Sequence, residues 1–412
     1  MANVRDRHED LLIKLHVEMK EGRGQGERAN EIGDEMNALW AELDDDDRDL
    51  FDELSEDLYL IEGKRLVAPM AEGETLDSVW KRTAIAFKER RDRDVLTLVR
   101  KLSEVDAQLA YVIGRCWERL GFLLGAVCFY DFAYEQQGKP VYAVSALEAL
   151  VRANQIQEAV ARVERIEGRL IVDGTLLLEA ASILHRAVTR LDAEHHPELY
   201  ERVVRMVEVA WIDPTAPPSM RASGLLAAGF SYEHLGRSAD ALRAFERAVA
   251  IYPKEAPLVA HGLALLKTNR RQAVALFTMA AKQRTQFDWP YLYAAQSALE
   301  EQRFAEVEQF CEGGLSLTER PDLRGRFYEW SGIAAANLGR PSEEVMELFD
   351  RALAELPFDP TIRRNADAFA AFSGNRSWKV EPPDDAKTPT LLVLEKTVMP
   401  KQKRQVELPA AA

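Results

Sequence analysis

One stretch of this sequence, residues 222–256, limits the possible folds more than any other, because its small and apolar residues recur at helical spacing. Four of them stand at i, i+3, i+4 and i+7, on one face of a first helix: Leu225, Ala228, Gly229 and Tyr232. Gly236 is typical of a helix end. Four more form one face of a second helix: Ala241, Leu242, Phe245 and Ala248. Pro253 cannot continue that helix, so the stretch predicts two helices joined by a turn.

The small residues of this stretch have a packing reason. Three of them let two helix backbones approach closely: Gly229, Ala241 and Ala248. Tyr232 and Phe245 fill the space beside them. The order large–small–Gly–Tyr, then Ala–aromatic, then Pro, within about 34 residues, resembles the tetratricopeptide repeat (TPR). It departs from that pattern at Leu225, where Trp is commonest, and at Ala228, where Leu is. The resemblance implies stacked helix pairs, since one pair cannot bury its apolar face alone.

Further copies of the pattern flank this stretch. Residues 107–140 repeat its spacing with Tyr111, Gly114 and Trp117, and then Ala126, Tyr130 and Ala133. Less regular copies cover the rest: 141–172, 173–218, 256–287, 288–321 and 325–358, with a closing helix at 361–374. The sequence therefore predicts an all-α protein, in which residues 75–374 form an α-solenoid of antiparallel helix pairs, a TPR-like superhelix.

The two ends of the chain differ from the repeats. Residues 1–62 predict an acidic N-terminal helical segment, and 63–74 read as a linker. Residues 375–412 form a proline-containing, irregular C-terminal tail, because Pro382, Pro383 and Pro389 are expected to forbid helix. Within this tail, residues 390–398 look strand-like. The tail is expected either to be disordered or to dock as a strand on this chain or on a partner.

Charge and composition exclude several classes of partner. Of the net charge of −15, residues 1–62 carry −13, with 20 acidic against 7 basic residues. An acidic chain without a basic stripe is a poor ligand for nucleic acid or an anionic membrane. The sequence has no secretory signal and no run of 18 apolar residues, so a cytoplasmic location is expected. The three cysteines predict reduced core residues: Cys116, Cys128 and Cys311.

No catalytic or metal-binding motif is evident. The four aspartates of residues 44–47 lack the alternating ligands and turn glycine of a calcium loop, and suit a helix N-terminus instead. His185, His195 and His196 lack ligands at zinc-site spacing. Phosphate-binding loops and nucleophile motifs are missing from the sequence. We therefore expect no enzyme activity, no cofactor and no metal site.

The resemblance to TPR proteins implies that the first helices of the pairs line a concave groove that binds an extended peptide or a partner helix. Residues off the Gly–Tyr face should line it: Tyr111, Arg115 and Arg119 in the 107–140 repeat, Leu226, Phe230, Glu233 and His234 in the 222–256 repeat, and later Trp289, Tyr293 and Trp330. The alternative is that a tight superhelix packs these aromatic residues internally. Leu226 and Phe230 stand where TPR clamps for chaperone tails use Lys and Asn, which argues against that ligand here.

Two functions follow as hypotheses. The first is a non-catalytic interaction scaffold or adaptor that binds a protein or peptide in the groove. The alternative is a structural protein that self-assembles into a homo-oligomer through its N-terminal helices or its tail. A weaker idea is regulated turnover through Ala410, Ala411 and Ala412, which look like a recognition tail for bacterial unfoldases.

Overall fold

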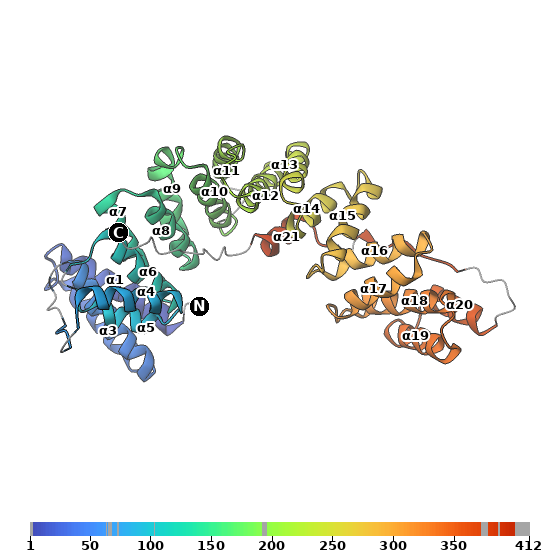
Figure 1. Ribbon diagram of the computed structural model, residues 1–412, viewed down its shortest axis with the longest axis horizontal. Helices are drawn as coiled ribbons and strands as arrows, with labels where there is room; N and C mark the ends of the chain where they lie inside the picture. The colour runs from blue at the N-terminus through green and yellow to red at the C-terminus, as the bar shows by residue number, and fades with distance from the viewer. Residues whose placement is uncertain are drawn as a thin grey trace. The chain divides into compact units, whose positions relative to one another are not determined.

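The computed structural model describes residues 3–62, 64, 68–71, 74–102, 104–191, 196–371, 378–385 and 388–399 (Figure 1). Within these ranges the regular elements are α-helices, and no strand is present. The prediction of an all-α solenoid is thereby confirmed. None of the helices in these ranges combines the length and the apolar character that crossing a membrane requires.

The chain divides into two compact units, with the boundary between Leu199 and Tyr200. The helices of unit 1 are α1 (Val4–Lys20), α2 (Glu27–Trp40), α3 (Asp45–Ile61), α4 (Leu76–Lys88), α5 (Asp92–Val99), α6 (Ala107–Arg119), α7 (Leu123–Gln137), α8 (Pro140–Arg152), α9 (Ile156–Leu170) and α10 (Gly174–Val188). Helix α11 (Pro197–Ala210) begins at the boundary.

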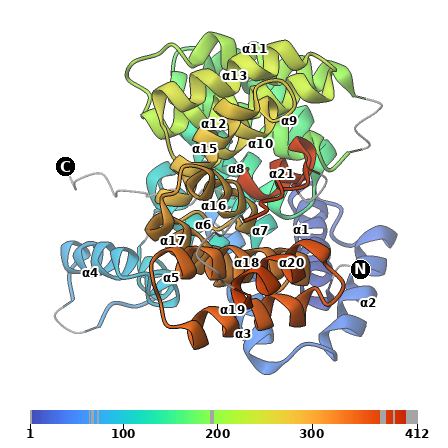
Figure 2. The ribbon, with the colours of Figure 1, turned by 90° about the vertical axis from the view of Figure 1, so that its right-hand side faces the viewer.

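Unit 2 continues the tandem helices. They are α12 (Pro218–His234), α13 (Ser238–Ile251), α14 (Glu255–Leu265), α15 (Arg270–Lys282), α16 (Asp288–Glu300), α17 (Phe304–Leu315), α18 (Pro321–Asn337), α19 (Ser342–Glu355), α20 (Pro360–Ala370) and α21 (Leu391–Val398). Successive helices pack against each other in the order of the sequence (Figures 1 and 2).

Local signals in the sequence set the helix ends. The Asp44 side chain accepts a 2.8 Å hydrogen bond from the Asp47 backbone N–H, so the aspartate run caps α3 as expected. Thr75 and Ser78 form a reciprocal capping box at the start of α4. Gly236, between α12 and α13, has φ = +70°, a left-handed conformation that glycine adopts without strain.

Close contact between a helical glycine and an aromatic ring joins the helices of several pairs. A Cβ at Gly229 would collide with the ring of Phe245, and one at Gly262 with the ring of Phe277. Gly114 contacts the Tyr130 ring in the same way in unit 1. The 107–140 and 222–256 stretches therefore do share one packing device. Gly313 and Gly314 serve the same purpose in α17, because the rings of Tyr291 and Phe327 occupy the space beside them.

The acidic N-terminal helices pack on the first repeat within unit 1. Helices α1 and α3 contact α7. The Arg5 guanidinium lies 4.3 Å from the centre of the Phe122 ring and donates a 2.7 Å hydrogen bond to the Leu120 carbonyl. Glu9 accepts a 2.8 Å hydrogen bond from the Gly125 backbone N–H at the start of α7. The apolar side of this segment is therefore already covered by its own unit.

The prediction of a strand at residues 390–398 is wrong, because Leu391–Val398 is the helix α21. Thr390 caps it by accepting a hydrogen bond from the Val393 backbone N–H. Pro389 precedes the cap, and proline forbids helix only in the interior. Leu394 and Val398, one turn apart, are buried where α21 contacts α12 and α14. Leu394 favours helix and Val398 favours strand, so burial against α12 and α14 decides the conformation of this short segment.

Several sequence features lie outside the described residues. These are half of the 63–74 linker (residues 63, 65–67 and 72–73), His195, the basic residues Lys401, Lys403 and Arg404, and the final alanines.

Candidate functional site

Most of the predicted groove residues are packed in the interior. Six of them are buried hydrophobic side chains: Tyr111, Leu226, Phe230, Trp289, Tyr293 and Trp330. Phe230 packs edge-on against Phe245, and Trp289 against Phe277. The structure therefore places these aromatic side chains in the interior, the arrangement of the second alternative. The physical reason is the tight stacking of helix pairs, in which large rings fill the space beside glycine and alanine.

The two arginines of unit 1 that were predicted to line the groove form ion pairs within the unit. Arg115 pairs with Glu118 at 2.6 Å, and this carboxylate also accepts a 2.6 Å hydrogen bond from the Tyr130 hydroxyl. Arg119 pairs with Asp92 at 3.0 Å and lies over the ring of Phe87. Both guanidinium groups are therefore paired with carboxylates of unit 1.

Two predicted residues of unit 2, His234 and Tyr293, contact the C-terminal segment of the same chain. His234 Nε2 lies 3.0 Å from a carboxylate oxygen of Glu395. The Tyr293 hydroxyl donates a 2.8 Å hydrogen bond to Asp385. Burial, and then the bond to Asp385, raise the pKa of Tyr293, so its hydroxyl keeps its proton and donates. The structure thus brings two candidate residues to one ligand-like segment.

We call the surface built by the first helices of unit 2 (α12, α14, α16, α18 and α20) the first-helix face. Contacts between α12 and α14, between α16 and α18, and between α18 and α20 place these helices side by side. The C-terminal segment, described at residues 378–385 and 388–399, lies on this face and runs from α20 back to α12, against the order of the repeats (Figures 1 and 2). We call it the tail segment.

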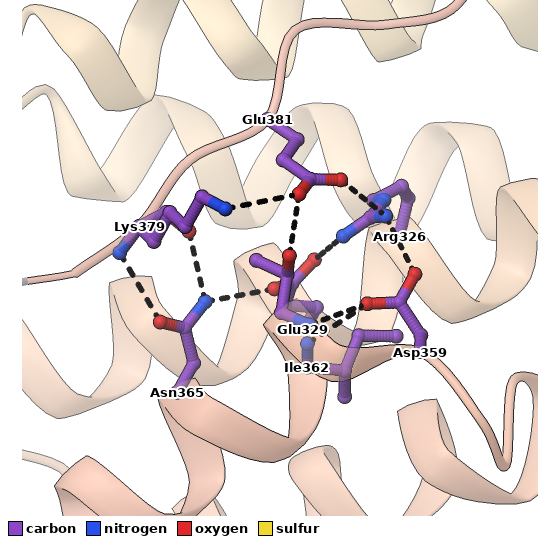
Figure 3. Close-up of polar contacts among 8 residues, drawn as sticks. Arg326, Glu329, Asp359, Ile362, Asn365, Lys379 and Glu381 are labelled. Atoms are coloured by element: carbon purple, nitrogen blue, oxygen red, sulfur yellow. Dashed lines mark hydrogen bonds and ion pairs between the residues drawn. The ribbon is translucent and has the colours of Figure 1, made fainter.

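The tail segment begins with an apolar anchor and a backbone clamp. Trp378 and Val380 pack against the core of the last repeats, and the Trp378 ring lies 6.1 Å from the Phe349 ring, nearly parallel to it. Asn365 on α20 bonds both backbone groups of Lys379, accepting from its N–H at 3.2 Å and donating to its carbonyl at 2.9 Å (Figure 3). A side chain that reads N–H and C=O of one residue recognises extended backbone whatever side chain it carries.

A buried carboxylate orients the clamp. The Asn365 amide donates a second hydrogen bond, of 2.8 Å, to Glu329, which is fully buried (Figure 3). This acceptor fixes which end of the amide is the donor. Burial raises the pKa of Glu329, while Arg326, paired with it at 2.5 Å, opposes that shift. A buried charge needs such partners, so Arg326, Glu329 and Asn365 form one network behind the tail segment.

Arg326 also faces the tail segment itself. Its guanidinium lies 2.7 Å from Asp359 and 3.2 Å from Glu381 of the tail segment (Figure 3). Glu381 in turn accepts a 2.5 Å hydrogen bond from the Thr361 hydroxyl on α20. That hydrogen bond, and then the Arg326 charge, lower the pKa of Glu381, so it is ionised on this face.

A second basic position lies further along the tail segment. Arg270, at the start of α15, pairs with Asp385 at 2.7 Å and donates a 3.2 Å hydrogen bond to the Pro383 carbonyl. The same guanidinium lies 5.3 Å from the centre of the Tyr293 ring. Beside Pro382 is a cavity of about 760 Å³, lined partly by Arg270, Arg271 and Arg303.

The three cysteines are free and are buried or half-buried. Burial raises the pKa of Cys128 and of Cys311 to about 12, and that of Cys116 above its ordinary value, so these residues are thiols at neutral pH. In the part of the chain that the structure describes, no group of three or more His, Cys, Asp or Glu residues is placed to hold a metal ion.

Sequence reasoning missed the clamp residues and the tail segment's docking site. A signal was present: Arg326 and Glu329 are charged residues one turn apart in a helix that is otherwise well buried, and Asn365 is buried in the closing helix. Charged and amide side chains at such positions call for partners. Their partner, Lys379 onward, could not be identified from spacing.

The chain was compared with known proteins. No model of a protein family matches it, and no curated protein matches its sequence. Several solved structures are similar. The C-terminal part of a TPR repeat-containing protein from Cytophaga hutchinsonii is 13% identical, covers 69% of this chain and 98% of its own, and has a TM-score of 0.34.

Two further similar structures are complexes. One is the TPR2AB domain of yeast Sti1 in complex with pHSP90, which is 15% identical, covers 60% of this chain and 98% of its own, and has a TM-score of 0.22. The other is the APC/C hetero-tetramer Cut9–Hcn1, which is 15% identical, covers 85% of this chain and 79% of its own, and has a TM-score of 0.26. These low scores carry no inference about function. With its tandem helix pairs, closed by glycine-on-ring contacts, the chain is a TPR-like α-solenoid protein.

Proposed function

We propose that the protein is a non-catalytic interaction scaffold that holds an extended segment of a partner protein on the first-helix face of unit 2. The observation that supports this most directly is the Asn365 clamp, which bonds both backbone groups of Lys379. A helix-packing element needs no such reader of extended backbone, whereas a peptide-binding surface does.

The surroundings of the clamp support the same function. Burial of the Glu329 carboxylate carries a desolvation penalty. Asn365 and Arg326 offset this penalty by a hydrogen bond and an ion pair. A well-packed apolar pair would stabilise the repeat as well as this network does. Stability alone therefore does not account for the buried network of Arg326, Glu329 and Asn365, whereas the orientation of Asn365 toward a ligand does.

The self-assembly alternative has less support. The surfaces it would use are engaged inside the chain, because α1 and α3 pack on α7 and α21 packs on α12 and α14.

The proposal can be tested by selecting peptides that bind the first-helix face. A random library of displayed peptides is selected on the full-length chain and on the same chain with Trp378→Ala, which loosens the tail segment. Affinities of enriched peptides are then measured by fluorescence polarisation on further variants. We expect Asn365→Ala to weaken binding about 30-fold, because two hydrogen bonds of about 1 kcal/mol each are lost.

Asn337→Ala is the matched control, since Asn337 is an exposed residue of α18 that bonds the Ile333 carbonyl of its own helix. Circular dichroism establishes that both variants are folded. Peptides that bind the two variants equally well, or a selection that enriches none on either form of the chain, would show that the face is not a peptide site.

A further inference from the structure

We infer that the tail segment, residues 378–399, is a built-in competitor for the first-helix face, and that the partner segment it excludes is extended and acidic with an aromatic residue at its start. This rests on the proposed function, because it concerns the ligand of the same face and the control of access to it.

The charges on the two sides are complementary. Two tail carboxylates pair with guanidinium groups of the repeats, Glu381 with Arg326 and Asp385 with Arg270, and a third, Glu395, lies 3.0 Å from the His234 imidazole. In all three pairs the repeats supply the basic group and the tail segment supplies the acid. A segment that replaces the tail must therefore bring carboxylates of its own, or leave these basic groups without that partner.

The backbone and the first side chain set the other requirements. Asn365 reads backbone in an extended conformation at Lys379, directly after Trp378. Pro382 and Pro383, three and four residues after Lys379, keep the chain extended, because proline fixes φ and has no backbone N–H. Trp378 packs in the apolar end of the face beside Phe349. The ligand pattern is thus an aromatic residue, extended backbone, and then acids three and seven positions later, as at Glu381 and Asp385.

The ion pairs in the middle of the tail segment are half-exposed, so another segment can replace them. The side chains of Arg270 and Asp385 are 40% and 39% exposed, and that of Glu381 is 39% exposed. Ion pairs at such exposure are weak. Helix α21 has 8 residues, too few to be stable without a surface to pack on. The tail segment therefore depends on the face for its order, and another segment of the same chemistry can replace it.

Covalent attachment gives the tail segment an advantage over a free peptide. A tethered ligand acts at an effective concentration in the millimolar range. A separate peptide of equal intrinsic affinity therefore binds only the fraction of molecules whose face is open. Weakening the tail segment should raise the apparent affinity of the peptide, without any change in the face itself.

The experiment uses a fluorescein-labelled peptide with the sequence of residues 377–399 and three full-length chains. The tail variant carries Trp378→Ala, Glu381→Gln and Asp385→Asn. The control carries Val393→Ala and Lys396→Ala, two exposed positions of α21. The third chain is unmodified. We expect the peptide to bind the tail variant at least about 10-fold more tightly than the other two chains, because its competitor is weakened.

The charge requirement is tested with a second peptide that carries Glu381→Gln, Asp385→Asn and Glu395→Gln. It should bind the tail variant about 10-fold more weakly than the acidic peptide. Equal binding of the acidic peptide to the unmodified chain and the tail variant would overturn the competition. Equal binding of the acidic and neutral peptides would overturn the acidic ligand.

A measurement on the unmodified chain covers the case in which the tail variant does not fold. Excess acidic peptide, carrying Lys396→Ala so that its fragments differ in mass, should speed hydrogen exchange in α21 but not in α19. Unchanged exchange in α21 would contradict displacement. If the acidic peptide binds no chain while library peptides bind in an Asn365-dependent manner, the inference fails and the proposed function stands. If neither binds, both fail.

Discussion

At the residue scale, buried acids in this protein work as connectors. Glu329 holds the clamp Asn365 and the guanidinium of Arg326. In unit 1, Glu9 reaches from α1 to the backbone of Gly125. Both carboxyls have a pKa raised by burial, and for Glu9 it is about 7. A buried carboxyl of this kind connects two helices, and its contribution to the free energy of unfolding depends on pH.

Glu9 should make unit 1 less stable as the pH rises. Because its folded pKa of about 7 is above the ordinary 4.5, its contribution is fully present below pH 4.5 and is lost as the pH rises through 7. Glu9→Gln keeps an oxygen to accept from Gly125 and cannot ionise. At pH 8 we expect the variant to exceed the unmodified chain in unfolding free energy by about 2–3 kcal/mol, with little difference at pH 5.

Urea denaturation at both pH values measures this. Glu31→Gln, an exposed glutamate on α2, is the matched control and should leave the pH dependence unchanged. A Glu9→Gln curve parallel to that of the unmodified chain between pH 5 and 8 would contradict the role assigned to Glu9.

At the scale of elements, the glycine-on-ring contact defines a helix pair. Where the ring of the second helix occupies the space of a Cβ on the first, no other residue fits without movement of one helix. Gly229 against Phe245 is such a position, whereas Gly168 in α9 has no atom within 4 Å of where its Cβ would stand. Two helical glycines in one chain thus differ only in whether a partner fills that space.

The same substitution should therefore have opposite effects at the two sites. Gly229→Ala is expected to destabilise unit 2 by about 1–3 kcal/mol, because the Phe245 ring must shift. Gly168→Ala should stabilise unit 1 by about 0.5–1 kcal/mol, because alanine favours helix over glycine and meets no clash. Chemical denaturation followed by circular dichroism compares them. A neutral Gly229→Ala would mean that close helix approach is not what joins this pair.

At the scale of the whole molecule, successive helices contact mainly their neighbours in sequence, so stability is local within each unit. In unit 2 the tail segment departs from this order, because it returns from α20 to α12 along the first-helix face. A solenoid with its own segment on its first-helix face joins distant repeats without enlarging its core.

Because stability is local, a destabilising substitution should increase local unfolding only in the neighbouring helices. Gly229→Ala should speed amide hydrogen exchange in α12 to α14 by about 5-fold or more, the equivalent of 1 kcal/mol of local unfolding, and leave α18 and α19 unchanged. Hydrogen exchange followed by mass spectrometry measures each helix separately. Equal acceleration from α12 to α19 would show that unit 2 unfolds as one cooperative body.

The sequence alone determined the all-α class, the helix pairs and many of their ends, because spacing at 3.6 residues, capping side chains and turn glycines are local signals. It also determined the pairing of Gly229 with the second helix, since the partner residue stands in the same repeat. The sequence could not show which aromatic residues are exposed on the first-helix face. In a close-packed helix pair, aromatic residues at the same positions form the core.

Only the tertiary structure decided the rest. Residues 390–398 became helix rather than strand because α12 and α14 provide a surface for Leu394 and Val398, and eight residues have too little intrinsic preference to choose. The clamp joins Asn365 to Lys379, and Tyr293 meets Asp385, across loops whose length says nothing about which residues meet. Periodicity is a property of neighbouring residues, whereas the return of the tail segment to its own repeats depends on burial and charge distributed over the whole unit.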